Sequence, residues 1–447
     1  MKTRYLISDL KTLPDQSDVV LAGFVETVRD QKKIQFVILR DESGSIQLVN
    51  PATRSVEAEN DLSGEMQAQT NRISGLTAGS FVRVEGTLKI DDRVKLGGLE
   101  VKIGTIEQAS SAEPEPPIAH DSSPEKRMDW RFLDLRRPEA KLIFEIQTAF
   151  EHSIRSQWIS QGWIEIHTPK LMASASETRA ELFEVPYFDS VAYLAQSPQF
   201  YKQMAQSAGF GAVFEIAPAF RADPSFTARH ATEFTSIDAE MSWIDSHEDV
   251  MQMQEASLVA GISSVHEKYG DIIEETMGVK IKIPDTPFPR ITLREARKIV
   301  ADEGHTNPRV DGDLDPESER RLSAHFEAKT GNQFVFVTDY ESDIRPFYHM
   351  RHESDGELTK SYDLLFRGTE ISTGAQREHR LDKLQAQATE KGMELRQLEQ
   401  YFNFFRHGVP PHGGFGMGLA RVLMLMLELS SIRETTLLFR GPNRLTP

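Results

Sequence analysis

Residues 212–244, AVFEIAPAFRADPSFTARHATEFTSIDAEMSWI, contain two runs of strand-forming residues separated by a polar loop. The first run closes at Phe220 and the second opens near Phe234, which predicts a hairpin. The later stretches 333–340 (QFVFVTDY) and 361–373 (SYDLLFRGTEIST) add further strands. Because strands follow one another here, without regular alternation with helices, we expect an antiparallel α+β sheet and not a doubly wound parallel one.

Upstream of this sheet, apolar residues at helical spacing predict a long amphipathic helix. The apolar positions are Ile143, Ile146, Phe150, Ile154 and Trp158. Pro138 suits the first turn of such a helix. The alternating stretch WIEIHTP (163–169) then predicts a strand that Pro169 ends or places at a sheet edge.

The first hundred residues differ, because Tyr5 to about Glu107 hold five strand-like stretches with little helix. A small closed barrel is expected, and an OB-fold or a generic β-domain fits the pattern equally well. The proline-rich stretch 110–126, SSAEPEPPIAHDSSPEK, reads as a linker. We therefore predict a barrel at residues 1–107, a linker at 108–127 and a second domain at 128–447.

The composition excludes several classes of protein. With 51 basic and 68 acidic side chains, the net charge of −17 argues against binding nucleic acid through bulk charge, although a local basic groove stays possible. The absence of cysteine rules out disulfides, thiolate nucleophiles and Cys-ligated metals. No apolar run approaches the ~20 residues of a membrane span, so we expect a cytoplasmic protein with no membrane partner.

A glycine-rich stretch precedes an apolar helix at residues 413–427, GGFGMGLARVLMLML. Glycines at 414, 416 and 418 would let the backbone approach a ligand, and Arg421 would bring a permanent positive charge beside them. That combination suits a polyphosphate. Taken alone, Arg421 would be read as a surface cation, and the long helix and strand as core.

Together, the helix and strand, the stretch FRADPSFTARHATEF and the glycine-rich segment resemble the three signature motifs of class II aminoacyl-tRNA synthetases. The stretches LAQSPQFYKQM, FRGTEISTGAQREHR and PPHGGFG and the terminal RLTP resemble aspartyl-tRNA synthetases of the compact archaeal and eukaryotic type. That resemblance implies an N-terminal OB-fold that binds the anticodon and an antiparallel-sheet catalytic domain. It also implies ATP, Mg²⁺, L-aspartate and tRNA(Asp) as ligands, and a homodimer joined through residues 138–160 and the strand ending at Pro169.

For the amino-acid site, Gln199 and Lys202 are three apart behind Pro198 and would share one helix face. The resemblance implies that Lys202 pairs with the substrate's side-chain carboxylate and that Arg377 is the second cation. Such a clamp favours aspartate over asparagine. The resemblance also assigns Glu177 and Asp238 to the substrate ammonium and, more weakly, Tyr348 to the same pocket. The plainer interpretations are a solvated Lys202, a surface Glu177 and a core Tyr348.

For ATP and magnesium, the resemblance implies two further sets. The ATP set is Arg221, Asp223, His230, Phe234, Glu370, Gly416, Gly418 and Arg421. The metal set is Asp363, Glu370 and Thr373, whose oxygen atoms suit Mg²⁺. Arg221 and Arg421 would act in catalysis by spreading the charge that develops when the aspartate carboxylate attacks the α-phosphate. Asp363 and Glu370 could also be solvated acids of the hairpin.

For the anticodon, the resemblance implies Arg29, Phe36, Gln47 and Lys95, although Phe36 could instead be barrel core. In relatives that reject tRNA(Asn), a tryptophan stands where this chain has Glu26. We expect Glu26 to face solvent or pair with Lys95, and tRNA(Asn) to be charged as well as tRNA(Asp). The alternative is that another residue discriminates.

Two departures from the family pattern keep rival functions open. Asp223 stands where a glutamate is usual, and Ala420 stands where a glutamate usually precedes the arginine. The rivals are an asparaginyl-tRNA synthetase, a free asparagine synthetase, and a weakened paralogue that binds tRNA or adenylate. His349 and His352 lack a third ligand in metal-binding spacing and are read as surface or packing residues.

Overall fold

The computed structural model describes residues 3–53, 61–119, 121–173, 182–309 and 311–447, with the backbone alone at 61–63. The chain forms two compact units, residues 1–122 and 123–447. Strand β5 ends at Ser110 and helix α2 begins at Pro124, on either side of the boundary between the units. In the part of the chain that the structure describes, no helix combines the length and apolarity needed to cross a bilayer.

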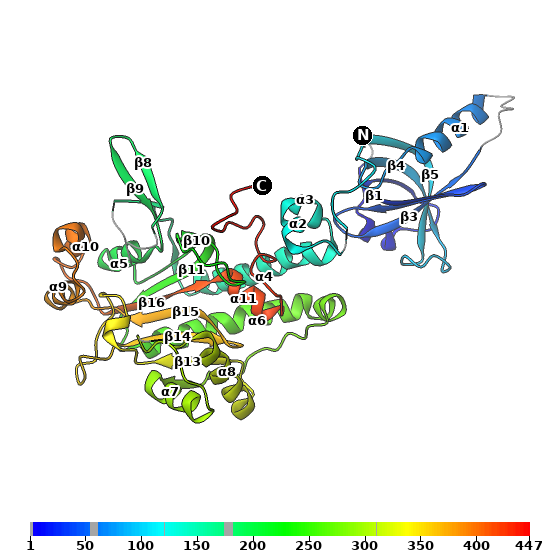
Figure 1. The fold of residues 1–447 in the computed structure, drawn as a ribbon. Coiled ribbons are helices and arrows are strands. Elements are labelled where there is room, and N and C mark those ends of the chain that lie inside the picture. Colours follow the sequence, from blue (N-terminus) through cyan, green and yellow to red (C-terminus); the bar gives the residue numbers. More distant parts are fainter. Residues whose placement is uncertain (1–2, 54–60, 120, 174–181, 310) are drawn as a thin grey trace. The chain divides into compact units, whose positions relative to one another are not determined.

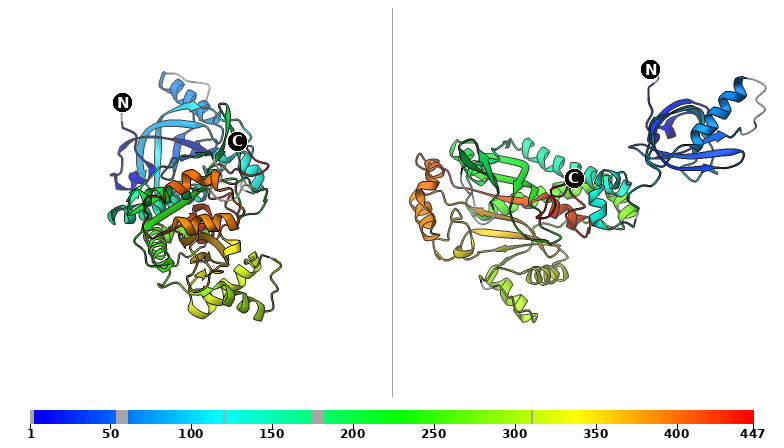
Figure 2. Two further views of the ribbon diagram at one scale, coloured as in Figure 1. Left: turned by 90° about the vertical axis from the view of Figure 1, so that its left-hand side faces the viewer. Right: turned by 45° about the horizontal axis from the view of Figure 1, so that its top comes forward.

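The first unit is a closed five-stranded barrel with the strand order β1-β2-β3-β5-β4 (Figure 2). Its strands are β1 (Asp18–Asp30), β2 (Ile34–Arg40), β3 (Ser45–Pro51), β4 (Phe81–Ile90) and β5 (Leu99–Ser110). Alternation along each strand places Val37, Leu39 and Leu48 inside the barrel. The expected OB-fold is confirmed, but helix α1 (Asp61–Ser74) between β3 and β4 was not expected. The buried Gln35 amide binds this helix at Thr70 O and Ser74 Oγ, both at 3.0 Å.

The second unit is built on an eight-stranded sheet with the order β12-β13-β14-β15-β16-β11-β10-β6. The strands are β6 (Ile164–Glu165), β10 (Ala212–Phe220), β11 (Glu233–Ser242), β12 (Arg290–Thr292), β13 (Phe334–Thr338), β14 (Ser361–Phe366), β15 (Thr369–Gln376) and β16 (His412–Gly418). All neighbours are antiparallel except β12 with β13 and β6 with β10. The expected α+β class is therefore confirmed.

One predicted strand is shorter than expected. Of residues 163–169, only Ile164–Glu165 pairs with β10. The Thr168 N–H and hydroxyl instead donate to the carboxylate of Glu215, each at 2.7 Å, which removes them from any ladder. A separate small sheet follows, formed by β7 (Leu171–Met172), β8 (Glu184–Tyr187) and β9 (Ser190–Leu194).

Two long helices, α4 (Pro138–Ser160) and α6 (His247–Met277), pack together along one face of the large sheet (Figure 1). The five apolar residues that predicted α4 are all buried in the core beneath it. Trp158 is fully buried there and donates from Nε1 to Ser257 Oγ at 2.9 Å. The other helices are α2 (Pro124–Asp129), α3 (Arg131–Asp134), α5 (Gln199–Ser207), α7 (Leu293–Asp302), α8 (Pro316–Thr330), α9 (Leu381–Glu390), α10 (Glu399–Asn403) and α11 (Leu419–Met426).

Because side chains alternate along the central strands, core residues lie on one face of the sheet and candidate site residues on the other. Ile237 and Ala239 of β11, with Phe415 of β16, belong to the core cluster shared with α4 and α6. Asp238 and Gly416 lie between these residues along their strands and pair with each other across the sheet. They point to the opposite face. The hydrophobic pattern that packs the helices thus also places polar groups on the face that carries the site.

Candidate active site

A cavity of about 370 Å³ lies on that polar face of the sheet. It brings together most of the predicted site residues from six separate segments. Those that line it are Gln199, Arg221, Asp223, His230, Phe234, Asp238, Tyr348, Glu370, Thr373, Arg377, Gly416, Gly418 and Arg421. Lys202 and Asp363 lie behind its wall, and Glu177 lies outside the described residues.

At one end of the cavity, Lys202 is enclosed by protein acceptors. It is 1% exposed, and its Nζ lies 2.9 Å from Asp238 Oδ1, 3.5 Å from Glu240 Oε2 and 3.0 Å from the carbonyl oxygen of Phe415. The plainer interpretation of Lys202 as a solvated cation is therefore wrong. Its predicted partner, a substrate carboxylate, stays a prediction, because here the ammonium is paired with carboxylates of the protein.

Arg377 occupies the same end and is anchored on three sides. Its Nε lies 3.0 Å from Glu240 Oε1, its Nη2 donates to the Gly414 carbonyl at 2.9 Å, and its Nη1 donates to His349 Nε2 at 3.0 Å. Burial raises the pKa of Glu240, but the charges of Arg377 and Lys202 outweigh it and hold the pKa below its ordinary value. Gly414 must be glycine, since a Cβ there would meet Ala239 O and the Glu240 carboxylate. That glycine accommodates Glu240 and does not line the cavity.

Gln199 is held by an amide network that the sequence did not suggest. Its Nε2 donates to Gln203 Oε1 at 3.1 Å, and the Tyr401 hydroxyl donates to the same oxygen at 2.9 Å. Gln203 Nε2 lies 3.0 Å from His412 Nε2. Burial lowers the pKa of His412 to about 4, so the ring is neutral near pH 7 and can accept this bond. The network fixes which way the Gln199 amide faces.

The other end of the cavity carries Arg221, Phe234 and Arg421. The Arg221 guanidinium lies over the Phe234 ring, 5.7 Å from its centroid. Arg421 donates from Nη1 to the Glu370 carbonyl at 2.9 Å and from Nε to the Arg229 carbonyl at 3.3 Å. Main-chain carbonyls therefore orient Arg421. Ala420, where a carboxylate is usual, packs in an apolar cluster that includes Met128.

The loop between β10 and β11 places two titratable groups beside these arginines. Asp223 Oδ1 accepts from the Ser225 N–H at 2.9 Å, and its Oδ2 lies 3.9 Å from His230 Nε2. Burial and the charge of Arg421 lower the pKa of His230. A neutral imidazole is expected there at pH 7, next to a positive surface suited to phosphate.

Arg229 and Glu319 form a contact that the sequence reading missed. Arg229 lines the cavity, and its Nη1 lies 3.1 Å from Oε2 of Glu319 on α8. Burial and the charge of Glu370 raise the pKa of Glu319 to about 7. The spacing of α8 gave no signal for this contact, because helix and loop are about ninety residues apart in sequence.

The predicted metal ligands meet on the hairpin of β14 and β15. Thr373 Oγ1 donates to Asp363 Oδ1 at 2.8 Å and contacts Glu370 Oε1 at 3.2 Å. The Nη2 atom of Arg345 lies 2.6 Å from Oδ2 of Asp363 and neutralises this carboxylate. Among the described residues, no group of three or more His, Asp or Glu side chains is placed to hold a metal. Glu370 and Thr373 thus face the cavity as a pair, with Asp363 behind them.

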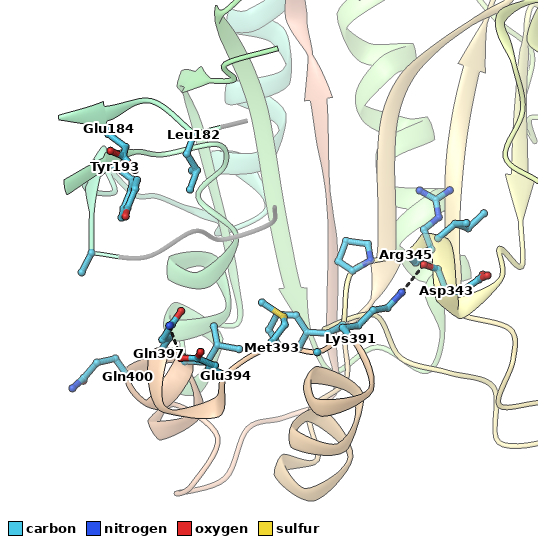
Figure 3. Close-up of a pocket in the computed structure, with 16 residues that line it drawn as sticks. Leu182, Glu184, Tyr193, Asp343, Arg345, Lys391, Met393, Glu394, Gln397 and Gln400 are labelled. Carbon is cyan, nitrogen blue, oxygen red and sulfur yellow. Dashed lines mark hydrogen bonds between the residues drawn. The ribbon is translucent and has the colours of Figure 1, made fainter. Parts of the chain in front are cut away.

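A second cavity, of about 1160 Å³, shares Arg345 and Pro346 with the first. Figure 3 shows Tyr193 and Glu184 of the small sheet on one side and Lys391 and Glu394 on the other. Lys391 Nζ donates to the Asp343 carbonyl at 2.6 Å. The mixed charges of this lining favour no single class of ligand.

On the barrel, the predicted anticodon residues lie on its outer side. Phe36 alternates with the core residues Val37 and Leu39, and its Cα pairs with that of Arg29. The alternative that Phe36 belongs to the barrel core is therefore wrong. Gln47 donates to Glu100 Oε2 at 3.1 Å, and Lys95 is exposed in the loop between β4 and β5.

The expected pairing of Glu26 with Lys95 is not found. Glu26 lies 2.5 Å from Arg40 Nε and accepts from the Ser45 hydroxyl at 2.9 Å. Strand pairing explains this, because Arg40 and Ser45 are cross-strand partners at the ends of β2 and β3, next to β1. Both carboxylate oxygens are thus occupied within the barrel.

Known proteins share both units. Residues 123–440 match the tRNA synthetases class II (D, K and N), and residues 19–109 match the OB-fold nucleic acid binding domain. The aspartate–tRNA(Asp/Asn) ligase of Aeropyrum pernix is 38% identical over 96% of this chain and 95% of its own length. The aspartate–tRNA(Asp) ligase of Pyrococcus abyssi is 39% identical over 96% of both.

Solved structures agree with these matches. The asparaginyl-tRNA synthetase of Pyrococcus horikoshii, complexed with asparaginyl-adenylate, superposes with a TM-score of 0.90 at 32% identity over the full length of both chains. The aspartyl-tRNA synthetase of Entamoeba histolytica gives 0.86 at 29% identity, covering all of this chain and 93% of its own. The chain therefore belongs to the class II tRNA synthetases of the D, K and N group, with an N-terminal OB-fold.

Proposed function

We propose that this chain is an aspartate–tRNA ligase, which activates L-aspartate with ATP and transfers it to tRNA. The observation that carries the proposal is the single cavity in which Arg377 stands at one end and Arg221 and Arg421 at the other. The guanidinium of Arg377 suits a side-chain carboxylate, and Arg221 and Arg421 suit the phosphates of ATP. The relatives named aspartate–tRNA ligases support the same substrate and disfavour a weakened paralogue.

In this mechanism the protein supplies position and charge. The aspartate α-carboxylate attacks the α-phosphate in line, and pyrophosphate leaves. Arg221 and Arg421 stabilise the negative charge that develops on the phosphate oxygens. Phe234 offers its ring to the adenine, while Asp238 accepts from the substrate ammonium. No side chain forms a covalent bond with the substrate.

The residues at the β14–β15 hairpin fit a magnesium ion. Glu370 and the Thr373 hydroxyl would hold it from the cavity side, and Asp363 would support Thr373 from behind. Mg²⁺ keeps several water and phosphate ligands, so a site with few protein oxygens suits it. When bound, the ion would supply charge neutralisation to the phosphates.

We propose that tRNA binds through the outer side of the barrel, with Arg29, Phe36, Gln47 and Lys95 near the anticodon. An outward aromatic and a nearby amide suit base stacking and base-edge recognition. Because Glu26 is occupied by Arg40 and Ser45, it offers no free group to discriminate between tRNA(Asp) and tRNA(Asn). We therefore propose that both tRNAs receive aspartate.

Two further proposals concern assembly and location. The edge strand β6 and the adjacent α4 expose Ile164 and Ile159, which suits a homodimer joined at this edge. Light scattering should give about twice the 50.5 kDa of one chain at micromolar concentration, and a monomer mass would contradict the dimer. We place the enzyme in the cytoplasm, where the absence of cysteine is compatible with reducing conditions.

Charging assays with purified tRNAs test the function. Radiolabelled aspartate should become acid-precipitable with tRNA(Asp) and with tRNA(Asn), at rates within about tenfold of each other. A preference for tRNA(Asp) above about a hundredfold, roughly 2.7 kcal/mol, would refute the proposal that both tRNAs are charged and would leave the ligase activity standing. Failure to charge either tRNA would refute the ligase and favour the binding paralogue.

A further inference from the structure

His349 is a buried histidine beside Arg377 at the amino-acid end of the cavity. It lines the cavity, is 2% exposed and forms an isolated backbone bridge with Arg377. Its Nε2 lies 3.0 Å from Arg377 Nη1. Since a guanidinium can only donate, Nε2 must be the acceptor, and the ring proton lies on Nδ1. The imidazole is therefore neutral.

Burial and the positive charge of Arg377 both agree with this assignment, because they hold the pKa of His349 far below its usual range. Nδ1 is buried and has no hydrogen-bond partner among the described residues. A buried donor without a partner costs free energy, so a structural role alone would not favour histidine over an apolar side chain of similar size.

The hydrogen bonds of Arg377 show what the histidine does. Of the five N–H groups of a guanidinium, Nε–H and both Nη2–H groups are directed to Glu240 and the Gly414 carbonyl. One Nη1–H goes to His349. Among the described residues this leaves one Nη1–H, on the same nitrogen that His349 binds, and the hydrogen bonds to Glu240, Gly414 and His349 together hold the guanidinium plane in which it lies.

We propose that His349 is a positioning residue for amino-acid specificity, which fixes the Arg377 guanidinium so that its remaining Nη1–H meets the side-chain carboxylate of aspartate. This inference rests on the proposed function and deepens it. A neutral acceptor suits this place, because Glu240 already balances the charge of Arg377, so a second carboxylate would repel the substrate's carboxylate and a cation would repel Arg377. The selectivity for aspartate over asparagine then depends on an imidazole that itself need not touch the substrate.

Two substitutions separate positioning from packing. His349→Leu removes the acceptor at similar volume, whereas His349→Gln keeps an acceptor oxygen. In aspartate-dependent ATP–pyrophosphate exchange, His349→Leu should raise KM for aspartate about tenfold or more, with KM for ATP within about twofold of wild type. Its preference for aspartate over asparagine should fall by a similar factor. His349→Gln should recover most of both. The control is His352→Leu, which removes a nearby histidine that instead pairs with Asp339 at 2.8 Å.

The inference is overturned if His349→Leu leaves both the aspartate KM and the selectivity unchanged. It is also overturned if His349→Leu raises KM for aspartate and ATP alike and His349→Gln restores neither, as a packing defect would. Thermal-shift titration with L-aspartate measures binding to the same pocket independently of adenylate formation. A wild-type chain that binds aspartate but catalyses no exchange would contradict the proposed function only, provided that His349→Leu loses the shift and His349→Gln keeps it. A wild-type chain that does not bind aspartate would contradict both.

Discussion

The two ends of the candidate active site are built differently. At the amino-acid end, Lys202, Asp238, Glu240 and Arg377 are almost completely buried and form short ion pairs with one another. At the nucleotide end, His230 and Asp223 are partly exposed and their ring nitrogen and carboxylate oxygen stand 3.9 Å apart. Buried charges must be paired to remain charged, whereas charges in contact with water need not be.

The difference indicates where specificity and adaptability lie. The amino-acid end is organised before any ligand arrives, so an amino acid without a side-chain carboxylate would leave the remaining N–H of Arg377 poorly satisfied. At the nucleotide end, main-chain carbonyls orient Arg421 of α11, and Glu319 pairs with Arg229 of the loop between β10 and β11. Substitutions at the first end should therefore disturb both folding and activity, and substitutions at the second mainly activity.

Lys202→Met should give the largest effect. Removing one partner of a buried ion pair costs about 3–5 kcal/mol, because Asp238 would lose its paired cation and Glu240 would keep Arg377 alone. Both the unfolding temperature of the catalytic unit and the exchange rate with aspartate should fall steeply. The matched control is Lys298→Met, an exposed lysine on α7. Wild-type exchange in Lys202→Met would mean that this network is not part of the amino-acid site.

Arg421→Ala should have a large effect on activity and a small effect on stability. Loss of one charged donor to a developing oxyanion reduces rates by about 10²–10³, or roughly 2.7–4 kcal/mol. Folding should change little, since Arg421 lies at the cavity and its hydrogen bonds to the described part of the chain are to two carbonyl oxygens. Differential scanning fluorimetry and ATP-dependent exchange, with Arg406→Ala as control, measure the two effects. A large drop in stability with near-normal exchange would reverse the proposed assignment of the two ends.

Glu319, at the nucleotide end, should make the stability of the folded protein depend on pH. Its pKa of about 7 exceeds the ~4.3 of an unfolded glutamate, so the folded protein retains a proton that the unfolded chain has lost between these values. Stability therefore falls as pH rises through this window. Glu319→Gln cannot ionise, and its stability relative to wild type should increase by about 2 kcal/mol between about pH 5 and pH 8. Denaturant titrations with EDTA present measure this. A difference that stays constant with pH would contradict the raised pKa.

Phe36→Ala should leave both ends of the cavity unaffected and act only on tRNA. Loss of one base stack costs about 1–3 kcal/mol, so charging should fall about tenfold while aspartate-dependent exchange is unchanged. Tyr5→Ala, an exposed aromatic of the same unit, is the control. If charging were normal in Phe36→Ala, the outer side of the barrel at β2 would not bind the anticodon.

Much of this architecture follows from local sequence. The helical spacing of Ile146, Phe150 and Trp158 predicts α4, and the strand runs on either side of FRADPSF predict the β10–β11 hairpin. These features depend on residues close in sequence, whose periodicity reports directly which face is buried.

What the sequence did not indicate depends on contacts between distant segments. Arg229 meets Glu319, and His349 accepts from Arg377, only because the sheet order brings β15 and the neighbouring segments together. Likewise Glu26 pairs with Arg40, where solvent or Lys95 was expected, because register across β1 and β2 decides the nearest cation. A single sequence without its sheet register contains no signal for such pairs.

The central claim is that the buried end of the cavity, which carries Arg377 and Lys202 with their paired carboxylates, selects aspartate. ATP–pyrophosphate exchange with wild-type protein, measured side by side with L-aspartate and L-asparagine, tests it most directly. The structure predicts exchange with aspartate at a kcat/KM at least about a hundredfold above that with asparagine, a difference of roughly 2.7 kcal/mol. Equal or preferred use of asparagine, or no exchange with either amino acid, would contradict the account.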